Sequence, residues 1–231
     1  TELTLFVPAP ELLVRLASGD RPLGLPAGPP HLRVLRETYF DTEDHALRGR
    51  GMTCKLRQME GEDPDLVVTV GEGPDSEGIT SRTRLTASAV GFGIFEALRA
   101  ESEAAHQIRK FVDPAHLRPR IALDIQRLGR VYRSAVLRRP ILLLFFDRIT
   151  VQAGTSSAVF HEMRIRRRRK GGPSIRVIGQ ELRDRYHLFP DGLSTLQRAY
   201  RILDLEQEGL RLDPGLSPYA LSLALAVFRE G

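Results

Sequence analysis

The stretch "ETYFDTEDHALRGRGMTCKLRQ", Glu37 to Gln58, contains two strand patterns separated by a glycine-rich turn. In the second strand the polar residues Thr53, Lys55 and Arg57 alternate with apolar residues, so one face of this strand is basic. Asp41 stands at the end of the first strand, where an Asp side chain commonly caps a turn. The stretch therefore predicts a strand, a capped turn and a second, amphipathic strand.

The rest of the chain alternates between strand patterns and helical patterns. Strand patterns dominate before residue 93 and return between residues 118 and 167, whereas residues 93–112 and 175–203 follow a helical period. The links between these segments are mostly short. This order favours an antiparallel α+β fold, with a closed barrel as one form of it, over a doubly wound sheet.

The composition is basic and contains a single cysteine. With 34 Lys and Arg residues against 29 Asp and Glu residues, the formal net charge is +5, which suits an anionic partner. The lone cysteine, Cys54, excludes an internal disulfide framework and favours a reducing compartment such as a bacterial cytoplasm. No apolar run approaches the roughly 20 residues that span a bilayer. We therefore expect a cytoplasmic protein that does not insert into a membrane.

Basic side chains gather on the polar faces of four predicted strands. A sheet face that only contacts water usually mixes Thr, Glu, Lys and Gln, so this bias carries information. If the strands close into a barrel with these faces inward, the crowded guanidinium groups need an anion, and phosphate oxygens match their geometry. The predicted phosphate-binding residues are Lys55, Arg57, Arg82, Arg84, Arg118, Arg120, Arg164 and Arg166.

The stretch from Glu37 to Gln58 also resembles the CYTH domain of the triphosphate tunnel metalloenzymes, where a "YFDT…L…G…LRxR" run precedes a "TxK" strand and an "RxExE" strand. The segment "FHEMRIRRRRKG", residues 160–171, stands where that family has its ExExE strand. The segment "DRYHLFPDGLSTLQRAYRIL", residues 184–203, is similar to the closing helix region of the family. The resemblance covers about residues 1–203.

The resemblance implies an eight-stranded antiparallel barrel that forms a tunnel with flanking helices. In that family Arg and Lys side chains hold a triphosphate, and glutamates bind the divalent metals used for hydrolysis or cyclisation. Lys55 and Arg57 match the LRxR motif, with Lys in place of the first Arg, and Arg82 matches the Arg of RxExE. Arg127 is the residue that would match a later tunnel Arg, although alternation places it on the apolar face of its strand.

The acidic half of the family pattern is largely missing. Arginine replaces several of the expected glutamates, and a guanidinium group offers no oxygen to Mg²⁺ or Mn²⁺. In the late ExExE strand only Glu162 remains, because Arg164 and Arg166 occupy the other two positions. The remaining departures are Thr4 and Phe6 after Glu2 in the first strand, Gly71 for the Lys of TxK, Arg84 and Thr86 in RxExE, and Thr195 for a Lys of the closing helix. Glu2 and Glu162 are the candidates for catalysis, and with Asp124 or Asp147 nearby they are the weak candidates for a single metal.

The sequence therefore favours a degenerate member of this superfamily that binds a polyphosphate, triphosphate or nucleotide anion. It needs no cofactor for binding and is expected to have lost metal-dependent catalysis. The first alternative is a divergent triphosphatase or adenylate cyclase that uses Mg²⁺ or Mn²⁺. The second is nucleic-acid or partner binding through the basic run 166–170, which aromatic residues do not interleave.

The domain division places the boundary after Asp204. Residues 1–204 form the predicted tunnel domain, and residues 205–231 form a C-terminal extension. The extension contains a turn and a helix-like apolar run, so it could begin a further domain, fused or acting as a partner.

Overall fold

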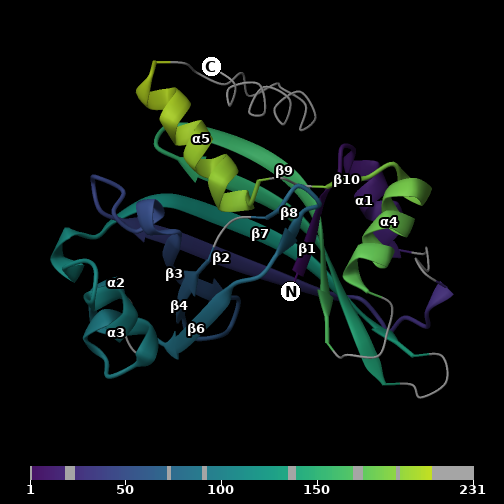
Figure 1. Ribbon diagram of the computed structural model, residues 1–231, viewed down its shortest axis with the longest axis horizontal. Helices are drawn as coiled ribbons and strands as arrows, with labels where there is room; N and C mark the ends of the chain where they lie inside the picture. The colour runs from purple at the N-terminus through teal and green to yellow at the C-terminus, as the bar shows by residue number, and fades with distance from the viewer. Residues whose placement is uncertain are drawn as a thin grey trace.

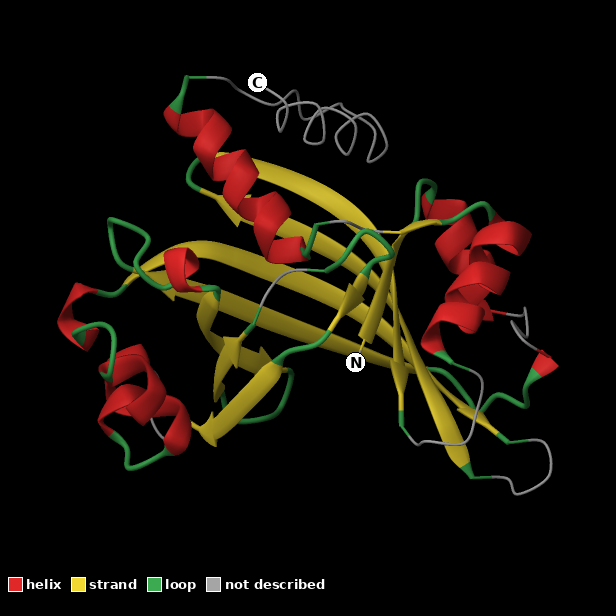
Figure 2. Cartoon of the chain, in the orientation of Figure 1, coloured by secondary structure: helices red, strands yellow, loops and turns green. Residues whose placement is uncertain are grey.

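The fold is taken from a computed structural model that describes residues 2–18, 24–71, 74–89, 93–134, 139–168, 174–190 and 193–209. Its described strands form a single antiparallel sheet that curls around an interior, with helices at its outside and at one end (Figures 1 and 2). Eight of these strands are five residues or longer, and two consist of two residues each. The predicted α+β class with a barrel-like antiparallel sheet is confirmed.

The eight longer strands are β1 (Glu2–Phe6), β2 (His31–Asp41), β3 (Met52–Met59), β4 (Asp65–Val70), β6 (Thr83–Ser88), β7 (Arg118–Arg133), β8 (Pro140–Ala153) and β9 (Ser156–Arg167). The short ones are β5 (Ile79–Thr80) and β10 (Phe189–Pro190). The sheet order is β10-β1-β9-β8-β7-β2-β3-β4-β6, and β5 pairs with β1.

The curl of the sheet is completed by residues 79–88. Their first part, β5, pairs with β1 through Glu2 opposite Thr80, and their second part, β6, pairs with β4 through Val70 opposite Thr83. The two ends of the strand order are therefore joined by one segment of chain. Because an antiparallel ladder leaves its edge groups unpaired, this closure satisfies backbone groups that an open sheet would expose.

The turn between β2 and β3 is built by Asp41, as the sequence predicts. Its Oδ1 accepts a hydrogen bond from the backbone N–H of Leu47 at 2.9 Å, and its Oδ2 accepts one from the N–H of Arg48 at 3.0 Å. The turn contains the short 3₁₀ helix η2 (Arg48–Arg50) and ends at Gly51, whose φ of 63° lies in the left-handed region. The cap therefore fixes where β3 begins.

Helices cover the outer face of the sheet in two groups. The helices α1 (Pro10–Ser18) and α4 (Ile175–Tyr186) bury apolar residues of β1, β8 and β9, among them Leu5, Phe146 and Ile165. The helices α2 (Ile94–Arg99) and α3 (Glu103–Arg109) lie over β3 and β4, beyond which the 3₁₀ helix η3 (Pro114–His116) leads into β7. The apolar faces of β1, β3, β4 and the second half of β9 are thus turned outward beneath helices, and their polar faces are turned inward.

The last helix, α5 (Thr195–Gln207), packs on the inner side of the sheet. Its residues Ala199 and Ile202 belong to a buried cluster that includes Leu123 and Ile125 of β7 and Phe160 of β9. This contact explains why β7 turns its apolar face inward, whereas the sequence analysis had placed its basic, Asp124-bearing face there. The interior consequently has an apolar end, filled by α5, and a polar end.

Candidate anion-binding cavity

The polar end of the interior contains a cavity of about 380 Å³. Residues of β1 to β6 and of β9 line it, together with Arg82 between β5 and β6 and the first residues of α5. Six basic side chains reach it, accompanied by the carboxylate of Glu2. The basic residues are Lys55, Arg82, Arg84, Arg164, Arg166 and Arg167.

Strand pairing explains why these side chains meet. Because alternate residues of a strand point to the same face, Arg164 and Arg166 of β9 share the inward face, and β1 places Thr4 and Glu2 directly opposite them. On the other side of the cavity, Arg84 of β6 pairs with Thr69 of β4. The alternation on β3, on β9 and along residues 79–88 therefore puts five of the eight predicted phosphate-binding residues around one cavity.

The other three predicted residues lie elsewhere. Arg57 faces inward on β3 but donates a hydrogen bond to Asp65 at 2.8 Å and does not line the cavity. Arg118 is exposed at the start of β7 and donates to the carbonyl oxygens of Ala115 and Leu117. Arg120, also on β7, is half-buried away from the cavity. The two β7 residues miss the cavity because this strand turns its apolar face inward.

Asp147 of β8 is a fully enclosed carboxylate of the interior, with 0% of its area exposed. Arg127 binds it with two nitrogens, at 2.8 Å and 3.0 Å, and Arg164 donates to it from the neighbouring strand. Burial alone would lower the pKa of Arg164, but Asp147, with Glu2 and Glu162, outweighs this effect and raises the pKa. Asp147 thus holds two guanidinium groups in place and leaves Arg164 firmly charged.

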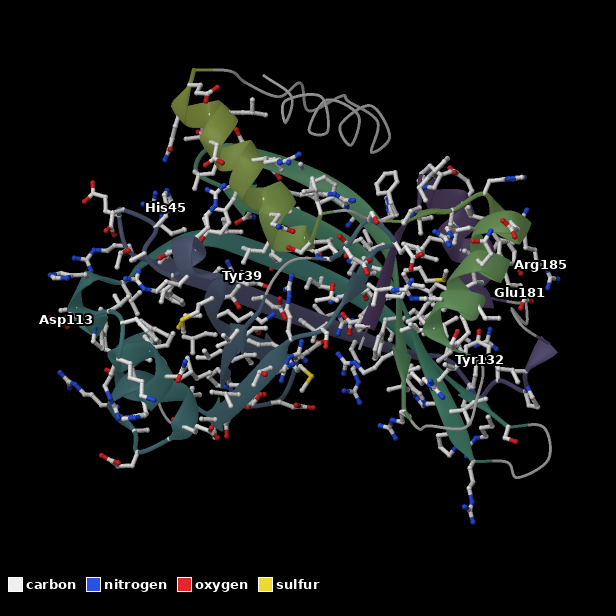
Figure 3. The ribbon with its side chains drawn as sticks, in the orientation of Figure 1. Tyr39, His45, Asp113, Tyr132, Glu181 and Arg185 are labelled. Atoms are coloured by element: carbon white, nitrogen blue, oxygen red, sulfur yellow. The ribbon has the colours of Figure 1, made fainter. Side chains whose placement is uncertain are left out.

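Lys55 is a second enclosed cation, and it shares a hydrogen-bonded cluster with Glu37 and Tyr39. Its Nζ donates to Glu37 at 2.6 Å and to the hydroxyl oxygen of Tyr39 at 2.9 Å, while that hydroxyl donates to Glu37 at 2.9 Å. Figure 3 labels Tyr39 within the curl of the sheet. Burial lowers the pKa of Lys55 to about 8, against the opposing effect of Glu37. Burial would raise the pKa of Glu37, but the Lys55 ammonium holds it at about 2. Both groups are therefore charged at neutral pH.

Glu162 of β9 holds α5 rather than facing an open site. The hydroxyl oxygen of Thr195 lies 2.9 and 2.8 Å from its two carboxylate oxygens, and Nη1 of Arg198 lies 3.3 Å from Oε1. Arg198 is itself buried, between the rings of Phe6 and Phe160 at 5.0 and 5.3 Å. Glu162 and Arg198 therefore form a buried pair that anchors the N-terminal turn of α5 to the sheet.

Arg84 and Arg166 lie together at the cavity. Arg166 donates two hydrogen bonds to Glu2, at 3.1 and 2.7 Å, whereas Arg84 has no hydrogen bond or ion pair with any residue that the structure describes. Burial and the nearby charge of Arg166 lower the pKa of Arg84, and Glu2 opposes them only in part. An anion placed between these side chains would relieve that repulsion.

The carboxylates present do not fit a divalent metal. Glu2, Asp147 and Glu162 are each bound by an arginine of this chain, and Asp124 lies on the outer face of β7 beside Arg36, at 3.8 Å. Within the described ranges no three side chains of metal-binding type come together. A Mg²⁺ or Mn²⁺ ion would therefore have to displace guanidinium groups to reach these oxygens.

Sequence reasoning missed several residues of this interior. Glu37 and Tyr39 were not singled out, although their alternation on β2 was a usable signal. Arg127 lies on the apolar face of β7, as alternation predicts, and that face is the inward one. The roles of Thr195 and Arg198 depend on where α5 docks, for which strand periodicity gives no signal.

A second cavity, of about 680 Å³, adjoins the first. Thr53, Arg82, Ser194 and Leu196 line both. The second cavity extends along α5 toward Tyr200, whose ring is covered by the guanidinium of Arg48 at 4.5 Å. The interior therefore offers an elongated space rather than a single compact pocket.

Taken with its inward basic residues, this curled antiparallel sheet is a CYTH-like fold. A putative adenylate cyclase from Bacillus halodurans superposes with a TM-score of 0.56 and 17% identity, covering 85% of this chain and 95% of that one. A putative adenylyl cyclase from Hippeastrum, described as having a dominant triphosphatase activity, superposes with a TM-score of 0.59 and 14% identity, covering 93% and 98%. A protein from Pyrococcus horikoshii gives 0.52 and 11%, covering 90% and 99%. At these identities the likeness concerns the fold.

Sequence comparisons add no closer relation. No family model matches the chain, and no curated protein matches its sequence significantly. Among the helices described in the structure, none is long and apolar enough to cross a membrane.

Proposed function

We propose that this chain binds a linear phosphate anion in its basic interior and does not turn the anion over by a metal-dependent route. The observation that carries the proposal is the grouping of Lys55, Arg82, Arg84, Arg164 and Arg166 around one cavity, where Glu2 is the one lining carboxylate among the described residues. Polyphosphate, triphosphate and nucleotide share the chemistry that such a cavity recognises.

The geometry of the cations supports a phosphate ligand. Arginine forks bind phosphate oxygens in pairs, and charge-assisted hydrogen bonds are roughly twice as strong as neutral ones. Arg164 is fixed by Asp147 and Arg166 by Glu2, so little side-chain entropy remains to be lost when an anion binds. The elongated space formed by the two adjoining cavities supports a chain of phosphates over a single one.

The state of the carboxylates supports loss of turnover. Two-metal phosphoryl chemistry needs carboxylate oxygens that can hold the ions beside the ligand. Here Asp147 is bound by Arg127 and Arg164, and Glu162 is bound by α5.

Calorimetry with sodium tripolyphosphate in EDTA tests the proposed binding. We expect one strong site, and we expect Arg84→Gln to weaken binding about tenfold or more, since it removes a charged donor worth about 1.5–3 kcal/mol. Arg36→Gln is the matched control, because Arg36 is 62% exposed on the outer face of the sheet. Absence of binding, or an equal loss in both variants, would contradict the proposal.

The fold likeness favours one alternative, a divergent triphosphatase or adenylate cyclase. That function requires phosphate release from tripolyphosphate, or cyclisation of ATP, in the presence of Mg²⁺ or Mn²⁺. Glu2→Gln should abolish it if Glu2 holds the metal, and Glu162→Ala should do so if Glu162 does. Metal-dependent turnover that either variant removes would establish the enzyme and overturn the loss of catalysis proposed above.

Nucleic-acid binding through the basic run 166–170 has less support. Arg166 pairs with Glu2 and Arg167 also lines the cavity, so neither belongs to a plain outer patch. Arg168 is exposed, and residues 169 and 170 lie outside the described residues.

The proposed further domain at 205–231 remains a prediction. The helix α5 continues to Gln207, past the expected boundary at Asp204, and residues 210–231 lie outside the described residues.

A further inference from the structure

Each carboxylate identified on the inward faces of the strands is bound by a cationic side chain of the same chain. The five pairs and their distances are Glu2 with Arg166 at 2.7 Å, Glu37 with Lys55 at 2.6 Å, Asp65 with Arg57 at 2.8 Å, Asp147 with Arg127 at 2.8 Å, and Glu162 with Arg198 at 3.3 Å. The chain therefore supplies internally the positive charges that bound metal ions would otherwise bring to these oxygens.

The interior remains positive after this pairing. Arg164 is a second cation on Asp147, and Arg82 and Arg84 also face the cavity. Of the described residues that line the cavity, six are basic and one, Glu2, is acidic, so positive charge exceeds negative charge around it. Because the walls are already cationic, an entering divalent cation meets repulsion and finds few oxygens free to bind it.

A magnesium ion bound to the oligophosphate would also weaken the attraction between the oligophosphate and the cationic side chains of the cavity. Mg²⁺ removes two units of negative charge from an oligophosphate and occupies oxygens that guanidinium forks would otherwise bind. Both effects weaken the binding of the anion, and both are larger in an interior that is shielded from water. The bare anion is therefore the better match for this cavity.

We propose that the cavity binds its oligophosphate as the metal-free anion and discriminates against the Mg²⁺ complex. This inference rests on the proposed function, because it specifies the form of the ligand at the same cavity. It implies that millimolar Mg²⁺ releases the ligand.

Tripolyphosphate is the probe for the test, with affinity measured by calorimetry in EDTA and again in excess Mg²⁺ with ionic strength matched by KCl. Matching the salt holds screening constant. We expect at least a tenfold loss of affinity in Mg²⁺, fully reversed when EDTA is added in excess. Titration of Mn²⁺ alone, followed by the electron paramagnetic resonance signal of free Mn²⁺, should show no stoichiometric binding.

A variant with one reversed charge in the cavity tests the same inference. In Arg84→Glu a new carboxylate lies near Glu2, so the ratio of affinities in EDTA and in Mg²⁺ should fall several-fold. The outer-face variant Arg36→Glu should keep the wild-type ratio. If Arg84→Glu does not fold, as judged by thermal melting, Arg84→Gln should lower the ratio in the same direction.

The outcomes separate this inference from the function on which it rests. Binding in EDTA that Mg²⁺ leaves unchanged or strengthens would overturn the inference and keep the proposed function. Stoichiometric Mn²⁺ binding without ligand, or an unchanged ratio in the charge-altered Arg84 variant, would also overturn the inference alone. Binding only in Mg²⁺ would overturn the inference and favour the metal-dependent alternative, and no binding in either buffer would end both proposals.

Discussion

Lys55 is the residue whose charge is most open to control by pH. It is enclosed by Glu37 and Tyr39 on one side and faces the arginines of the cavity on the other. Burial lowers its pKa to about 8, so its positive charge is present at neutral pH and is lost as pH rises through that value. An anion bound beside it favours the charged form and must raise this pKa.

Binding of tripolyphosphate should therefore take up protons at about pH 8.5, and its affinity should fall as pH rises above about 8. Calorimetry in two buffers with different ionisation enthalpies measures the uptake. The double variant Lys55→Met with Glu37→Gln removes both charges of the pair and controls for protons carried by the ligand. Equal uptake in the wild type and the double variant would show that Lys55 does not respond to the anion.

At the scale of a single element, α5 depends on polar anchors as well as on its apolar stripe. The buried pair of Glu162 and Arg198 holds its first turns, and an exposed pair between Arg48 and Asp204 lies nearer its end. Removing one partner of a buried pair leaves an uncompensated charge, whereas an exposed pair contributes little.

Glu162→Gln should accordingly lower the free energy of unfolding by about 1.5–3 kcal/mol, because Thr195 and Arg198 lose the charged acceptor that holds the first turns of α5. The control, Asp204→Asn, should lower it by less than about 1 kcal/mol. Urea denaturation followed by circular dichroism compares the two. Similar small losses in both variants would mean that Glu162 is not an anchor for α5.

The sequence predicts a strand, and the two faces of that strand, wherever polar and apolar residues alternate clearly. Alternation on β3, β6 and β9 placed Lys55, Arg84 and Arg164 on inward faces, because outer helices cover the apolar side of each strand. On β7 the same alternation gave two faces without saying which one is inward. The docking of α5 decides that question, and it is a contact between distant parts of the chain. The helical period over 93–112 likewise covers two helices, broken where Ser102 caps α3.

At the scale of the whole molecule, the fold gathers part of the basic excess of the sequence in one place. The net charge of +5 says little by itself, but the sheet turns several arginines into one enclosed interior. The order of motifs was enough to predict this architecture. It could not predict that the remaining acidic residues are paired internally, because those pairs form between strands β1 and β9, β7 and β8, and between β9 and α5.

The central claim is that the phosphate anion lies in this interior, held by the arginines of β6 and β9. A crystal structure of the chain with tripolyphosphate, grown in EDTA, tests it most directly. We expect density for the anion within hydrogen-bond distance of Arg84, Arg164 and Arg166, extending toward Arg82 where the two cavities adjoin. Density confined to the outer face of the sheet, with the interior filled by water, would contradict the account.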